Sequence, residues 1–145
     1  MTPDFDAVTV NLPIGEHAAS WQDMLERFGY TPWRQLLAGM LEALRLLREA
    51  GCTRAYIDGS FVTAKDEPGD FDACWDAEGV DFDLVDERLL AFDRGRATQK
   101  AAFMGELFIA DARADPQGTL FRDFFRTDRE VRRKGIVLIH LKDLP

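Results

Sequence analysis

The stretch that decides the fold reads Tyr-Ile-Asp-Gly-Ser-Phe over residues 56–61, followed by Asp-Phe-Asp over residues 70–72. The first run is apolar and strand-like, and it breaks at Gly59 and Ser60, where glycine lets the backbone approach a ligand closely. Ser60 can cap a following helix while its hydroxyl and the neighbouring amides face an anion. We therefore expect a phosphate-binding corner at the end of this strand.

Asp70 and Asp72 are two residues apart, so an extended strand places both side chains on one face and Phe71 on the other. Two carboxylates on one face repel each other unless a cation lies between them. Magnesium takes oxygen ligands, often one or two carboxylates together with the phosphates of a substrate. The pair predicts a site for Mg²⁺ or Mn²⁺ bound with a nucleoside triphosphate.

These residues resemble the Gly-Ser and Asp-x-Asp signature of the nucleotidyltransferase superfamily, the polymerase-beta-like fold, in its minimal form. More closely, the chain is similar to a family of uncharacterised small bacterial and phage proteins assigned to that superfamily. The similar segments are residues 12–17, 50–52, 58–65, 68–72, 105–108 and 134–137. The resemblance implies an α/β (α+β) fold, in which a small mixed β-sheet is flanked by helices.

The resemblance also implies a reaction, the transfer of a nucleoside monophosphate from a nucleoside triphosphate to a hydroxyl with release of pyrophosphate. In that reaction Gly59 and Ser60 would hold the β and γ phosphates, while Asp70 and Asp72 would hold the metal. Lys65 could reach a phosphate, although a lysine at a helix end that faces water also fits the pattern.

Members of the superfamily commonly supply a third carboxylate from a later strand, which activates the attacking hydroxyl as a general base. Residues 105–110 predict such a strand, and Glu106 is the candidate for the third acid. Asp83 and Asp111 remain alternatives. Two basic residues that precede this strand, Arg96 and Lys100, are further candidates for contacts to nucleotide phosphates.

Charge and composition limit the class of partner. The chain has 145 residues, 46% of them hydrophobic, which suits a single domain over residues 1–145 with an extended lead-in over residues 1–15. Its net charge of −8 repels nucleic acid as a whole, so RNA is a less favoured acceptor than a protein or a small molecule. Two separated cysteines and the lack of a long apolar run favour a cytoplasmic protein without a signal peptide or membrane span.

A basic segment contrasts with this acidic background. It is either a solvated face or a groove for triphosphate, RNA or an acidic partner. The segment contains Arg122, Arg126, Arg129, Arg132, Arg133 and Lys134.

Two functions therefore remain open. The first is a metal-dependent nucleotidyltransferase whose acceptor is a partner protein, as with antitoxins that modify a toxin. The second is a catalytically inactive protein of the same fold, such as an antitoxin that neutralises its partner by direct binding.

Apolar spacing places the secondary structure around this site. A capping box at Ser20 and Asp23 begins one helix, and an apolar stripe from Trp33 to Leu47 predicts a longer one that ends at Gly51. The stripe is expected to be core rather than an oligomer seam. Strands are expected over residues 53–58, 70–75, 105–110 and 135–141, and helical segments over residues 61–65, 84–92, 99–103 and 120–125.

Overall fold

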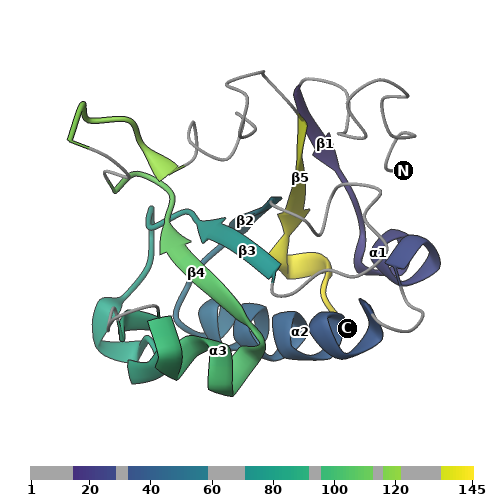
Figure 1. Cartoon of the computed structure of the whole chain (residues 1–145), viewed down its shortest axis with the longest axis horizontal. Coiled ribbons are helices and arrows are strands. Elements are labelled where there is room, and N and C mark those ends of the chain that lie inside the picture. Colours follow the sequence, from purple (N-terminus) through teal and green to yellow (C-terminus); the bar gives the residue numbers. More distant parts are fainter. Residues whose placement is uncertain (1–14, 29–32, 59–70, 92–95, 113–115, 122–134) are drawn as a thin grey trace.

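A mixed β-sheet with helices packed against one face makes up the described part of the chain (Figure 1). The computed structural model describes residues 15–28, 33–58, 71–91, 96–112, 116–121 and 135–145. Its strands are β1 (Gly15–Ala18), β2 (Arg54–Asp58), β3 (Phe71–Trp75), β4 (Gly105–Ile109) and β5 (Gly135–His140). The helices in these ranges are α1 (Trp21–Phe28), α2 (Trp33–Glu49) and α3 (Ala97–Phe103), with short 3-10 helices η2 (Phe82–Leu84), η3 (Glu87–Leu90) and η5 (Leu141–Asp143). The predicted α/β fold is confirmed.

The five strands lie in the order β1-β5-β2-β3-β4. The two outer pairs, β1 with β5 and β3 with β4, are parallel, whereas β2 is antiparallel to both of its neighbours. The last strand of the chain, β5, therefore lies inside the sheet and not at its edge. Its apolar run over residues 136–139 explains this position, because an inner strand buries side chains on both faces.

Helix α1 begins at the predicted capping box. The Asp23 backbone N–H donates to Ser20 Oγ at 3.0 Å, and the Ser20 N–H donates to Asp23 Oδ2 at 3.1 Å. These two bonds satisfy backbone donors that the first turn leaves without an intrahelical partner. The hydrogen bonds from Ser20 also lower the pKa of the Asp23 carboxyl.

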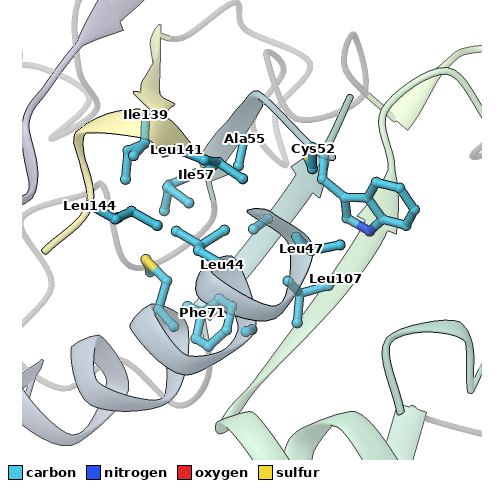
Figure 2. Close-up of a cluster of buried hydrophobic side chains, with 14 of the residues drawn as sticks. Leu44, Leu47, Cys52, Ala55, Ile57, Phe71, Leu107, Ile139, Leu141 and Leu144 are labelled. Atoms are coloured by element: carbon cyan, nitrogen blue, oxygen red, sulfur yellow. The ribbon is translucent and has the colours of Figure 1, made fainter. Parts of the chain in front are cut away.

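Helix α2 covers one face of the sheet with its apolar stripe. Figure 2 shows Leu44 and Leu47 of this helix among side chains from the strands, including Ile57 and Phe71. The buried members of the stripe are Leu36, Leu37, Met40, Leu44 and Leu47. The stripe is thus core, as predicted.

Glycines shape both the end of α2 and its contact with α3. Gly51 has a φ of +100°, and the N–H groups of Gly51 and Cys52 donate to the carbonyls of Arg48 and Leu47, which closes the helix in a Schellman motif. Gly39 lies against α3 so closely that a Cβ there would be 1.9 Å from the Phe103 carbonyl oxygen. The missing side chain therefore sets the distance between the two helices.

The connection from β3 to α3 differs from the expected helix over residues 84–92. Two 3-10 turns, η2 and η3, occur instead, separated by an extended Val85. Asp81 and Asp86 accept hydrogen bonds from the backbone N–H groups two residues ahead of them, those of Asp83 and Arg88. Such local bonds compete with the α-helix, which explains the difference.

Several predictions fall outside the described residues. They include the extended lead-in up to residue 14, the short helix over residues 61–65, the part of the helical segment over residues 120–125 that follows Phe121, and the basic segment from Arg122 to Lys134. Among the helices that the structure describes, none is long and apolar enough to cross a membrane.

Candidate functional site

Acidic residues line up across three adjacent strands at one end of the sheet. Asp58 at the end of β2 pairs in register with Asp72 of β3, and Asp72 pairs in register with Glu106 of β4. Neighbouring strands lie about 4.8 Å apart, and register partners on adjacent strands point to the same face. The side chains of Asp72 and Glu106 are therefore neighbours. We call Asp72 and Glu106 the acidic row.

The carboxylates of Asp72 and Glu106 lie on the face of the sheet opposite α2. Alternate residues of β3, namely Phe71, Ala73 and Trp75, belong to the main core beneath α2. Cys74 faces the other way, into a smaller buried cluster with Tyr56. Asp72, two residues before Cys74, shares its face and is partly buried.

A lysine lies beside the acidic row. The Lys100 ammonium of α3 is 3.1 Å from Glu106 Oε1. The Lys100 side chain is 40% exposed and the Glu106 side chain 23% exposed, so solvent and a small ligand can reach the pair. One cation is thus already positioned at the predicted third acid.

Side chains of α3 bind the backbone of β4 immediately beyond Glu106. Gln99 is fully buried, accepts a hydrogen bond from the Leu107 N–H at 2.9 Å and donates to the Leu89 carbonyl at 3.1 Å. The Arg96 guanidinium donates to the Leu107 carbonyl at 3.2 Å. Backbone groups of an edge strand that would otherwise lack partners are satisfied in this way, and the position of Glu106 is fixed.

An aromatic stack continues from Arg96. Its guanidinium carbon lies 4.0 Å from the centre of the Phe108 ring, and Phe108 stacks on Phe121 with ring centres 4.3 Å apart. Phe108 is two residues beyond Glu106 on β4, so both lie on the same face. The stack therefore supports the acidic row on the side of β4.

A second charged group occupies the opposite end of β3. Asp76 is buried and uses both carboxylate oxygens, one to accept from Arg54 at 2.6 Å and the other from the Glu78 N–H at 3.0 Å. Cys52 is also buried, and its thiol contacts the carbonyls of Arg54 and Asp76. We call Cys52, Arg54 and Asp76 the Asp76 cluster.

These contacts shift two ionisation equilibria at the Asp76 cluster. Burial raises the pKa of the Cys52 thiol to about 11. The hydrogen bond from Arg54 to Asp76 raises the pKa of the Arg54 guanidinium. The cluster is therefore a protonated thiol beside a fixed ion pair, which suits a structural role.

The structure brings together two of the predicted site residues, Asp72 and Glu106. Asp83 is exposed and lies in η2, outside the strands, and Asp111 follows the far end of β4. Asp70, Gly59, Ser60 and Lys65 lie outside the described residues, in the connector that leaves after Asp58 and returns before Phe71. Within the described ranges, no three His, Cys, Asp or Glu residues form a group that could hold a metal ion.

Sequence reasoning did not identify the role of Gln99. The signal was present, because Gln99 and Phe103 are four residues apart and thus share the buried face of α3. A polar residue on an apolar helix face needs hydrogen-bond partners, and β4 provides them. Glutamine at this position therefore predicts a contact with a neighbouring backbone.

The model of one protein family matches residues 3–140, which include every described strand and helices α1 to α3. The chain belongs to this family, DUF6932, a family of unknown function. No curated protein and no solved structure matches the chain significantly.

Proposed function

We propose that this DUF6932 protein is a metal-dependent nucleotidyltransferase that moves a nucleoside monophosphate from a nucleoside triphosphate to a hydroxyl. The observation that carries the proposal is the register of Asp72 and Glu106 on adjacent parallel strands. The resemblance of the Gly-Ser and Asp-x-Asp residues to the signature of the nucleotidyltransferase superfamily also supports the proposal.

The donor atoms of the acidic row suit magnesium or manganese. Carboxylate oxygens are the ligands that these hard cations prefer, and one or two of them suffice when phosphates complete the coordination. Asp72 is partly buried and Glu106 is beside it, and the Lys100 ammonium 3.1 Å from Glu106 Oε1 supports a cation site at this position. A metal bound there would neutralise the phosphates and lower the pKa of an attacking hydroxyl.

The phosphate side of the site begins at the same end of the sheet. Gly59 and Ser60 directly follow Asp58, the residue that pairs with Asp72. In the proposal they bind the β and γ phosphates through backbone N–H groups and a hydroxyl, and Lys65 adds a positive charge. Asp70 completes the pair with Asp72.

Glu106 serves as the general base in this proposal. It takes the proton of the acceptor hydroxyl while that oxygen attacks the α phosphorus, and pyrophosphate leaves with the electron pair of the broken P–O bond. The acceptor we favour is a hydroxyl of a partner protein, such as a toxin.

A non-catalytic binding protein of the same fold is the second candidate. The contact between Lys100 and Glu106 favours it, because a carboxylate held by a lysine is less available as a base. In this case the protein would neutralise a partner without modifying it.

Transfer of label from α-³²P-labelled ATP, GTP, CTP and UTP tests the proposal. The purified protein is incubated with Mg²⁺ and each nucleotide, alone, with the proteins encoded beside it and with total RNA. We expect labelling that is lost in Asp72→Asn and retained in Asp83→Asn, a matched change at an exposed acid outside the strands. Absence of labelling with every acceptor, or labelling that survives in Asp72→Asn, would overturn the proposal. Partner neutralisation that persists without labelling would support the second candidate.

A further inference from the structure

The ion pair between Lys100 and Glu106 joins a helix to the acidic row. Lys100 lies in α3, and Glu106 is the second residue of β4, which starts immediately after the left-handed turn at Met104. The turn reverses the chain, so a lysine six positions earlier reaches the glutamate at 3.1 Å. The contact thus depends on the fold and not on helical spacing.

The neighbours of Lys100 fix the position of the helix that carries it. Gln99 and Phe103 are buried on the inner face of α3, and Gln99 is bonded to the backbone at Leu107. The helix is therefore held in a fixed position against β4, with Lys100 at the side of the acidic row. The Lys100 side chain itself is long, flexible and half exposed.

We propose that Lys100 is an exchangeable cation of the nucleotide site. In the empty site it neutralises Glu106; when the metal and triphosphate bind, it leaves Glu106 and contacts the phosphates. This inference rests on the proposed function. It states that the metal and Lys100 compete for the Glu106 carboxylate, and that the triphosphate attracts Lys100 away from Glu106. Binding of metal and of triphosphate is then mutually favourable, since each ligand removes an obstacle to the other.

Charge and geometry support the exchange. An ammonium group is a compact cation with three donors and no fixed fork, so it can move between a carboxylate and a phosphate without a rotation of the helix. A partly exposed ion pair of this kind is weak and is readily replaced by a divalent ion. A triphosphate brings several negative charges to the same place and binds a lysine more strongly than one carboxylate does.

The test measures two ligands separately, with Lys100→Met as the main variant. Mn²⁺ binding is followed by electron paramagnetic resonance without nucleotide, and inorganic tripolyphosphate binding by titration calorimetry without metal. Tripolyphosphate replaces the nucleotide because its binding does not depend on which base the site prefers. Lys100→Arg keeps the positive charge, and Lys142→Met makes the same change at an exposed lysine in η5.

Lys100→Met is expected to shift the two affinities in opposite directions. Freeing Glu106 should tighten Mn²⁺ binding about threefold, the range of a partly exposed ion pair. Losing the ammonium should weaken tripolyphosphate binding about tenfold, as for a charge-assisted hydrogen bond. Lys100→Arg should stay near the wild type in both, and Lys142→Met should change neither. A lysine with a purely structural role would shift both affinities the same way or neither.

Asp72→Asn separates failure of this inference from failure of the proposed function. If Mn²⁺ binds the wild type and is lost in Asp72→Asn, but Lys100→Met alters neither affinity, the exchange is wrong and the nucleotide site stands. If the wild type binds no Mn²⁺ even with tripolyphosphate, the proposed function fails and the exchange fails with it. Weakening of both ligands by Lys100→Met would also contradict the exchange.

Discussion

An aspartate lies at each end of β3, Asp72 within the strand and Asp76 directly after it, and the two have different surroundings. Asp72 and Asp76 are four residues apart, about 13 Å in an extended chain. Asp76 is buried, and both of its oxygens accept hydrogen bonds from Arg54 and Glu78. Asp72 is only partly buried and lies beside Glu106.

This difference separates a structural carboxylate from a candidate for binding. At Asp76 a guanidinium compensates the charge in a fixed geometry, so a ligand would first have to displace it. At the acidic row two carboxylates are neighbours, and the Lys100 ammonium that contacts Glu106 is half exposed and sits on a flexible stem. Gathering like charges is unfavourable unless a cation binds, which is why we place the chemistry at this end.

The largest expected effect is on transfer at the acidic row. Asp72→Asn should lower the transfer rate at least about a thousandfold, equivalent to about 4 kcal/mol of transition-state stabilisation, because it removes a metal ligand. Its free energy of unfolding should change by less than in the variants described next, because the Asp72 side chain is only partly buried and asparagine has nearly the same shape. Label transfer and urea denaturation measure the two quantities. Equal transfer rates in Asp72→Asn and the wild type would contradict the proposed role of Asp72 in metal binding.

The next effect concerns the helix that holds β4 in place. Gln99→Leu should lower the free energy of unfolding by about 3 kcal/mol, since it leaves the Leu107 N–H and the Leu89 carbonyl buried without these partners. Urea denaturation measures the loss. Gln22→Leu, the same change at an exposed glutamine of α1, is the control and should cost much less. A loss in Gln99→Leu no greater than in the control would show that these bonds do not hold β4.

Breaking the Asp76 cluster should affect stability and spare the chemistry. Asp76→Asn removes the charge that Arg54 faces, and we expect a loss of about 2 kcal/mol, moderated because the Arg54 side chain is 39% exposed. Transfer per folded molecule should stay near the wild-type rate. Urea denaturation and label transfer on the same preparation measure both. Loss of transfer without loss of stability would reverse the roles assigned to the two aspartates.

The smallest effect is a slope in stability at alkaline pH. The folded Cys52 thiol, with its pKa raised to about 11 from 9.0, holds its proton more tightly than the unfolded thiol does. The stability from this group is complete below pH 9 and is lost as the pH rises from 9 to 11, with about 1 kcal/mol gone at pH 10. Urea denaturation at pH 8 and pH 10 measures this loss. Cys52→Ala should lack it, and equal slopes in the two proteins would contradict the assignment.

Local patterns were enough to predict much of the fold. The reciprocal bonds of Ser20 and Asp23, the stripe of α2 and the strand at Glu106 are encoded in neighbouring residues, so spacing identified them. The two 3-10 turns were mistaken for one helix, because the spacing of apolar residues does not report the bonds made by Asp81 and Asp86.

The pairing between strands could not be deduced from sequence to the same extent. The ion pair of Arg54 with Asp76 joins residues 22 positions apart and follows from the antiparallel register of β2 and β3. The contact of Lys100 with Glu106 requires the chain reversal at Met104. Methionine does not favour the left-handed backbone conformation found there, so the sequence did not predict this reversal. The sequence pattern therefore identified the acidic candidates, while the strand register determined which of them are neighbours.

The most direct test of the central claim counts the Mn²⁺ bound together with a nucleoside triphosphate. Electron paramagnetic resonance measures bound Mn²⁺ in the wild type and in three variants, Asp72→Asn, Glu106→Gln and Asp76→Asn. Each protein is measured with each of the four nucleoside triphosphates, and again with a non-hydrolysable analogue of any nucleotide that binds. We predict metal–nucleotide binding by the wild type and Asp76→Asn, with binding lost in Asp72→Asn and weakened in Glu106→Gln. Binding that survives in Asp72→Asn, or is absent from the folded wild type, would contradict a nucleotide site at the acidic row.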